Sequence, residues 1–435
     1  MTSLGLFRMG QRLLLSSVTL LLISCGSGSG TSAPDLVELA LPPPKGLLIS
    51  AENDVEFLDI FSLSIIEDGE DYLNNRDAIV VASTAEDSGR SFTTTYTLEA
   101  SVDEHDVVKY DGDHLFIAPS RSMDCCFVMP AVSSVSTDQS EEDPDNTSEE
   151  QRGIRILSTD PEQATAALVS IIPVDGGLTV EGLYNKESKL VSLRSSSWWG
   201  MFGDRFSVSW AWEGQTSALD IYDISTPEQP ELKLQIEMEG GFVTSRRVDD
   251  TVYMVARHTP TIDGLIRYPV TQEEIEENKL LLSGLTVADV LPTVSINGES
   301  RLLVEASQCL FMDKTNEQAS ERYGFPVMTF VIAVDLESES MLGASCYMGS
   351  VSGVYASENA IYLSQTEGYD EASRTLVHSY EFSDFLSYQG SGAVEGHLWG
   401  RGEVDFRISE YEGYLRLVTT TQAGPWGSDN SINHQ

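Results

Sequence analysis

Carboxylates and histidines are the side chains in this sequence whose types and spacing could support catalysis. Asp103, Glu104 and Asp106 cluster just before an expected strand, where they could bind a cation or act as general acid and base. Carboxylates also cluster by chance in so acidic a chain, so a solvated surface is the simpler interpretation. The six histidines lack the helical spacing of a zinc protease, and Gly349–Gly353 has valine where a nucleophile elbow needs serine. We therefore expect no catalytic residue, metal site or cofactor.

Two consecutive tryptophans, Trp198 and Trp199, are the best candidates for ligand binding. Ser and Gly residues flank them, so a loop that carries them could offer a stacking platform for a sugar or a peptide. The alternative is that this loop packs against the body, since tryptophan is usually mostly buried. The next apolar residues alternate and predict a strand with its aromatic side chains in the core: Phe206, Val208, Trp210 and Trp212.

Four of the five cysteines follow residue 100 and leave three disulfide pairings open. Cys125 and Cys126 are adjacent and seldom bridge each other, because the small ring strains the peptide. We favour a disulfide between Cys309 and Cys346. The sequence contains no CxxC and no zinc-finger spacing, so a redox or zinc role is not expected.

The N-terminus has the pattern of an export signal. Arg8 and Arg12 precede the apolar run Leu13–Ile23, which is too short to span a bilayer and has the length of a signal-peptide core. The sequence LISCG that ends this run resembles the lipobox of bacterial lipoproteins. The resemblance implies that residues 1–24 are a cleaved signal peptide and that Cys25 is diacylated on its sulfur. The alternative is a buried cysteine in an ordinary signal peptide or anchor helix.

A tether, residues 25–45, follows the lipobox. It begins with alternating Gly and Ser, which are flexible, and ends near three consecutive prolines, which are stiff and extended. No Asp follows Cys25, which by the rule for enteric-type lipoproteins favours the outer membrane over the inner. We expect a protein of the bacterial cell envelope that contacts the membrane through the lipid at Cys25.

The chain is strongly acidic. It has 26 basic and 68 acidic side chains, and removal of Arg8 and Arg12 with the leader gives a charge of 24 − 68 = −44. Such a chain repels nucleic acid, because binding there depends on counterion release by Lys and Arg. Solubility is the simplest meaning of this charge, and no EF-hand or nonapeptide calcium repeat points to a cation-collecting surface.

The segment Ser217–His258 predicts one four-stranded sheet. Strands of alternating apolar residues are expected at 218–224, 232–238, 242–248 and 251–256, which is the size of a propeller blade. An Asp-Gly hairpin at Asp111-Gly112 resembles the last two strands of that sheet. Similar endings recur at 182–193, 246–255, 353–363 and 406–418, so that five closing hairpins imply five blades.

The remaining segments interrupt or flank these repeats. Residues 46–91 have no clear fold, although residues 55–66 are apolar and 70–75 could form a helical turn. The acidic segment 133–151 is too poor in apolar residues to fold and is expected to be disordered. A capping box at Thr271–Glu274 predicts a helix, and together with a second short helix it forms a helical insertion over 271–292. We place a β-propeller at 92–426 and a C-terminal tail at 427–435.

The assembled stretches resemble a family of secreted prokaryotic proteins with a C-terminal β-propeller that is distantly related to WD repeats. The stretches that carry the resemblance include SVDEHDVVKYDGDHLFI, LDIYDISTPEQPELKLQIEMEGGFVTSRRVDDTVYMV and VDFRISEYEGYLRLVTTT. The resemblance implies an all-β propeller and an exported location, and it carries no activity or catalytic residue. Family members continue for several more blades, so we expect a C-terminally shortened chain or a ring built differently.

These observations favour a lipid-anchored envelope propeller that acts as a non-catalytic binding or scaffold module for a protein or a glycan. One alternative is an envelope enzyme whose acidic and histidine residues meet at the propeller channel. In that case Asp103, Asp106, Arg246 and His258 should lie close together in the fold. The other alternative is an inactive, truncated fragment of a longer propeller protein.

Overall fold

The computed structural model of the chain describes residues 46–75, 99, 101–119, 153–174, 177–196, 209–316, 319, 324, 326–349, 351–367, 373–382, 386–398, 407–422 and 432–434. Several predicted features lie outside these residues: the lipobox with Cys25, the acidic segment 133–151, Cys125, Cys126, Trp198 and Trp199. Within the described ranges, no helix is long and apolar enough to cross a membrane.

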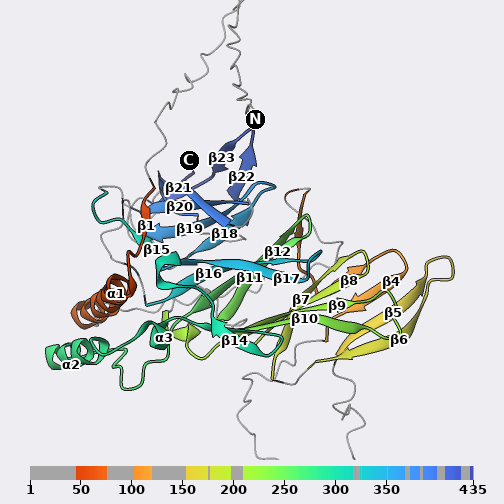
Figure 1. Cartoon of the computed structure of the whole chain (residues 1–435). Helices are drawn as coiled ribbons and strands as arrows, with labels where there is room; N and C mark the ends of the chain where they lie inside the picture. Colours follow the sequence, from red (N-terminus) through yellow and green to blue (C-terminus); the bar gives the residue numbers. More distant parts are fainter. Residues whose placement is uncertain are drawn as a thin grey trace, which may run out of the picture. The chain divides into compact units, whose positions relative to one another are not determined.

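Four antiparallel meanders of four strands each form the framework of the described chain (Figure 1). The first meander consists of β3 (Val108–Tyr110), β4 (His114–Ile117), β5 (Gly153–Asp160) and β6 (Thr165–Pro173). The second consists of β7 (Thr179–Lys186), β8 (Lys189–Ser195), β9 (Thr216–Asp223) and β10 (Glu231–Glu239). In both, successive strands are hydrogen-bonded neighbours, because short turns join most of them.

Two further meanders and two hairpins follow. The third meander consists of β11 (Gly241–Val248), β12 (Thr251–His258), β16 (Met328–Asp335) and β17 (Ser340–Tyr347). The fourth consists of β18 (Gly353–Ala356), β19 (Ala360–Glu367), β20 (Arg374–Phe382) and β21 (Leu386–Glu395). The hairpins pair β22 (Ile408–Tyr411) with β23 (Tyr414–Leu417) and β24 (Thr420–Gln422) with β25 (Ile432–His434). The predicted all-β fold of four-stranded antiparallel units is thereby confirmed.

The predicted boundaries between the four-stranded units are wrong by two strands. Ser217–His258 is not one sheet, because β9 and β10 belong to the second meander whereas β11 and β12 begin the third. Gly240 alone connects β10 to β11, with a left-handed φ of +124°. A Cβ atom at this position would lie 3.0 Å from the carbonyl oxygen of Arg257. Each of the five hairpins therefore forms the first two strands of a unit and not the last two. Alternation of apolar residues along a strand does not reveal which of the two positions a hairpin occupies.

The long connection between β12 and β16 contains the helical insertion. α2 (Gln272–Leu282) begins at the expected capping box, in which the Glu274 amide donates to the Thr271 hydroxyl over 3.2 Å. α3 (Val287–Val290) follows. The hairpin β13 (Thr293–Ile296) and β14 (Glu299–Leu302) then extends the second meander beyond β10.

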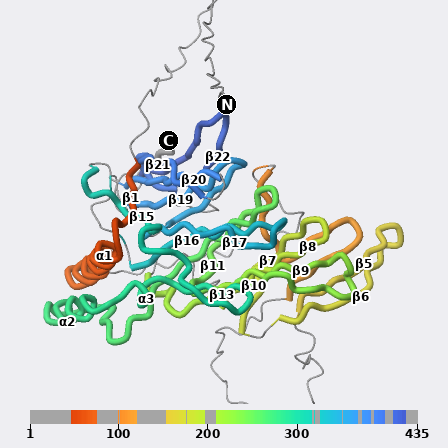
Figure 2. The backbone as a smooth tube through the Cα atoms, viewed as in Figure 1, coloured from red at the N-terminus to blue at the C-terminus, as the bar shows by residue number. Residues whose placement is uncertain are grey.

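The third meander is extended by strands from two distant parts of the chain. β15 (Cys309–Met312) lies parallel to β17, and β1 (Leu48–Ser50) pairs with the far edge of β15. A disulfide joins Cys309 to Cys346 across the β15–β17 pair, and both residues are buried. The N-terminal segment of unclear fold forms α1 (Asp54–Asn75), which packs against α2 (Figure 2).

The third meander is buried on both faces. Val252, Met254 and Ala256 of β12 enter one hydrophobic core, whereas Tyr253 and Val255 enter another on the opposite face. Side chains alternate across a strand, so a strand that separates two cores must be apolar at nearly every position. The continuous apolar sequence of β12 follows from this position.

One ion pair is buried inside the second meander. The guanidinium of Arg194 in β8 donates to both carboxylate oxygens of Asp220 in β9, over 2.6 and 3.0 Å. Burial raises the pKa of the Asp220 carboxyl, and the hydrogen bond and charge of Arg194 oppose that shift. The pair fixes the second strand of this meander against the third.

Candidate functional site

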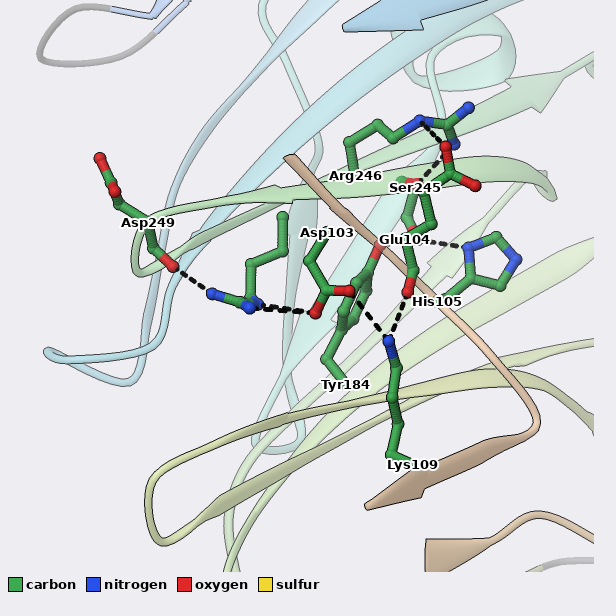
Figure 3. Close-up of polar contacts among 9 residues, drawn as sticks. Asp103, Glu104, His105, Lys109, Tyr184, Ser245, Arg246 and Asp249 are labelled. Carbon is green, nitrogen blue, oxygen red and sulfur yellow. Dashed lines mark hydrogen bonds and ion pairs between the residues drawn. The ribbon is translucent and has the colours of Figure 1, made fainter. Parts of the chain in front are cut away.

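A polar cluster forms where first strands of neighbouring meanders come together (Figure 3). β2 (Val102–Glu104) pairs with β11, so that Glu104 lies opposite Arg246 and Asp103 opposite Arg247. Two residues later, the backbone of Asp106 exchanges hydrogen bonds with Leu183 of β7, over 3.2 and 2.8 Å. The segment that contains the predicted carboxylates is therefore held between β7 and β11.

Each of the two carboxylates on β2 contacts a cation. The Asp103 carboxylate accepts hydrogen bonds from Lys109 Nζ and from Arg247 Nη2, each over 3.0 Å. Lys109 also donates to the backbone oxygen of Glu104 over 2.6 Å, and the Glu104 carboxylate lies 3.5 Å from Arg246 Nε. The side chains of Lys109 and Arg246 are 7% and 8% exposed, so water does not replace these partners. Charge is matched locally across the β2–β11 pair.

A chain of hydrogen bonds through a tyrosine, a serine and a histidine lies beside these ion pairs. The Tyr184 hydroxyl is 2.8 Å from Ser245 Oγ, which is 2.9 Å from His105 Nδ1. Burial raises the pKa of Tyr184 far above its usual range, so its hydroxyl keeps its proton. The His105 and Phe242 rings are nearly perpendicular, with centroids 5.2 Å apart, and a Cβ at Gly182 would lie 2.6 Å from the His105 ring. Glycine at this position therefore makes room for the histidine.

The geometry of this cluster indicates a structural role, in which polar side chains join neighbouring strands. A serine hydrogen-bonded to a histidine is the arrangement that activates a nucleophile, but the Ser245 side chain is completely buried and bonded on two sides. A substrate carbonyl cannot reach that oxygen without displacing Tyr184 or His105. Asp103 and Glu104 are engaged by cations in the same way. The polar side chains hold β2, β7 and β11 in register.

The residues proposed for a channel enzyme are only partly brought together. Asp103, Asp106 and Arg246 lie at the cluster, whereas His258 is at the other end of β12, opposite Met328. His258 lines an open pocket with Glu239 and residues around α2 and α3, and burial lowers its pKa to about 4. Among the described residues, no group of three or more His, Cys, Asp or Glu side chains is placed to hold a metal ion.

The strand predicted to contain Trp210 and Trp212 is a short 3-10 helix, Ser209–Trp212, so that prediction is wrong. Both indoles are nonetheless buried, and they enter different hydrophobic cores. With three residues per turn, positions two apart point in different directions, whereas a strand would have placed both indoles on one face. Phe206 and Val208 lie outside the described residues.

Sequence reasoning did not find His105, Lys109, Tyr184, Ser245 or Arg247. Asp103 and Arg247 are 144 residues apart, and no spacing rule connects them. One signal was available, because an acidic pair in one short strand matches a basic pair in another, in a chain poor in basic residues.

Four-stranded antiparallel meanders in which the first strands β3, β7 and β11 come into contact define a β-propeller protein. The chain belongs to the family described as the beta propeller domain, whose model matches residues 92–434. Nothing among the curated proteins matches the chain. A chain from the crystal structure of the mitotic checkpoint complex is 9% identical, with 82% of this chain and 96% of that chain covered, at a TM-score of 0.15. In general terms, a β-propeller domain is a binding or scaffold module.

Proposed function

We propose that this protein is a bacterial lipoprotein of the cell envelope, whose β-propeller binds or scaffolds a protein or glycan without catalysis. The observation that carries the binding role is the β-propeller domain over residues 92–434. Propellers present loops and strand edges from a rigid frame, which suits recognition. The paired carboxylates Asp103 and Glu104 support a structural use of the acids that were candidates for catalysis.

The proposed location depends on Cys25. Arg8, Arg12 and the apolar run Leu13–Ile23 fit an export signal, and the residues around Cys25 fit a lipobox. Two acyl chains on one cysteine are the kind of double signal that gives stable membrane attachment. The Gly/Ser tether would then separate the acidic propeller from the anionic membrane surface.

Cell fractionation of a bacterial host that expresses the full chain tests this proposal. We expect the wild-type chain in the membrane fraction, with the mass of a diacylglyceryl group on its N-terminal peptide. Cys25→Ser should move the protein to the soluble fraction, whereas the matched control Ser27→Ala should leave it on the membrane. Retention of Cys25→Ser on the membrane would overturn the anchor.

A second measurement tests the binding role. The full chain, purified in detergent, should capture an envelope protein or glycan that is absent when the chain is heat-denatured. Turnover of a captured molecule would overturn the non-catalytic assignment. Variants Asp103→Asn and Arg247→Gln should then weaken folding and binding together, because their ion pair is structural.

A further inference from the structure

The four meanders share one register between their second and third strands. In each, the first residue of the second strand pairs with one residue of the third strand. The backbone N–H of the residue after that partner donates a hydrogen bond to the carbonyl of the turn residue just before the second strand. These bonds are Thr159 to Asp113 (2.8 Å), Ile224 to Ser188 (2.7 Å), Leu336 to Asp250 (2.7 Å) and Phe382 to Asn359 (2.9 Å). A contact repeated four times in this way specifies where a third strand joins any hairpin of this chain.

The third strands also share a side-chain pattern. The residue opposite the first position of the second strand is acidic in three of the four meanders: Asp223, Asp335 and Glu381, with Ser158 in the other. The residue before it is apolar or aromatic and faces an aliphatic partner: Leu157, Tyr222, Val334 and Tyr380. Cross-strand pairs of this kind are the unit that stabilises a sheet.

The fifth hairpin has the same first two strands, and within the described ranges no third strand lies against its outer edge. Among the described residues, β23 pairs only with β22. Leu415 and Leu417 pack against the core that contains Tyr355 and Ile408, so the hairpin is seated on the fourth meander. Tyr414, the position that faces the acidic residue in the other meanders, is 75% exposed.

We propose that the outer edge of β23 binds an extended segment of a partner protein as a third strand. In this arrangement an acidic residue of the partner faces Tyr414, and an apolar residue faces Leu415. Strand addition obtains affinity from main-chain hydrogen bonds and specificity from alternate side chains. Arg416 projects from the same face as Tyr414 and adds a cation diagonal to the acidic residue, as Lys189 is opposite Asp223 in the second meander. This inference deepens the proposed binding role and rests on it.

The chain supplies its own probe for the test. A fluorescein-labelled peptide with the sequence of residues 216–225 contains β9 and places Asp223 opposite Tyr414 and Tyr222 opposite Leu415. Its binding to the full chain in detergent is measured by fluorescence anisotropy, with a scrambled peptide as control. Amide exchange should show added protection at Leu415 and Leu417 when the peptide is bound.

Charges of opposite sign introduced at position 414 make the test specific to the proposed register. Tyr414→Lys should tighten peptide binding by roughly two- to fivefold and Tyr414→Glu should weaken it by a similar factor. A peptide with Lys in place of Asp223 should reverse that order. Leu280→Glu on α2 is the matched control, because Leu280 is 78% exposed and distant in sequence, and it should change neither affinity.

Three outcomes would overturn the assignment. Failure of the peptide to bind would mean that this edge is not an acceptor, and unchanged order with the Lys peptide would mean that the register is wrong. A concentration-dependent dimer that is lost in Tyr414→Glu would assign the edge to a second copy of the chain. None of these results depends on Cys25, so failure here is distinguishable from failure of the membrane anchor.

Discussion

The hairpins β7–β8 and β22–β23 have the same local structure and very different surroundings. Each turns through a left-handed residue, Glu187 at φ 52° and Glu412 at φ 51°. In the second meander, β9 lies against β8, and Leu190 is fully buried. At the matching place in the fifth hairpin, Leu415 is only half-buried, and Tyr411 and Tyr414 beside the turn are 56% and 75% exposed. Turn chemistry forms a hairpin, but a third strand and a neighbouring sheet are needed to bury it.

The largest expected effect removes the ion pair that joins the second and third strands of the second meander. Asp220→Ala leaves the Arg194 guanidinium buried with its nearest remaining carboxylate, Glu237, 4.0 Å away. Loss of the hydrogen-bonded partner of a buried charge costs about 3–5 kcal/mol. Urea denaturation followed by tryptophan fluorescence would measure the loss.

An exposed ion pair supplies the control for that experiment. Glu276 and Lys279 are 2.9 Å apart on the surface of α2. Surface pairs are screened by water and salt, so Glu276→Ala should leave the denaturation midpoint unchanged. Equal losses from Asp220→Ala and Glu276→Ala would show that the buried pair does not hold β8 to β9.

A smaller effect compares equivalent leucines in the two hairpins. Leu190 and Leu415 both occupy the second position of a second strand, but Leu190 is fully buried and Leu415 is half-buried. Leu190→Ala should cost about 2–4 kcal/mol, which includes the cavity it leaves. Leu415→Ala should cost about 1 kcal/mol, in proportion to the smaller apolar area it buries.

Guanidinium denaturation of both variants measures this difference. If Leu415→Ala proved as costly as Leu190→Ala, the outer face of β23 would already be covered in the free chain. That result would also contradict the open edge on which the strand-acceptor proposal rests.

Local signals in the sequence predicted the features that form locally. The Asp111-Gly112 turn and the Thr271–Glu274 capping box each depend on residues a few positions apart, and both elements are present. Helix α1 was harder, because Gly69 weakens helical propensity. The structure explains that glycine, since a Cβ there would lie 2.9 Å from the ring of Pro269.

Features that depend on distant pairing could not be predicted. Whether β11 belongs with β10 or with β12 and β16 depends on which edges meet, and Gly240 leaves no composition shift at the boundary. The site has the same limitation, because Asp103, Tyr184 and Ser245 come together only after β2, β7 and β11 have been placed. The repeats were enough to predict the fold class. The site could not be predicted without knowing which residues pair across neighbouring strands.

A dependence of stability on pH is also expected, and it comes from the fourth meander. His378 occupies the place in β20 that Asp220 occupies in β9, but among the described residues it has no charged partner. Its Nδ1 is 2.6 Å from Ser391 Oγ. Burial lowers the pKa of His378 to about 3. The unfolded chain takes up a proton near pH 6.5 while the folded chain does not, so folding stability falls as pH decreases below that value. Between pH 7 and pH 5 this residue should remove about 2 kcal/mol.

The comparison of variants isolates that contribution from those of the many carboxylates. His378→Gln should be less stable than wild type at pH 7, and the difference should shrink by about 2 kcal/mol at pH 5, because only the wild-type chain loses stability by histidine protonation. Ser391→Ala keeps the buried imidazole and should retain the wild-type pH dependence, since burial and not this hydrogen bond lowers the pKa of His378. A constant difference between His378→Gln and wild type across this range would mean that water reaches the imidazole. The third strand of the fourth meander would then be less tightly covered than β9 is in the second.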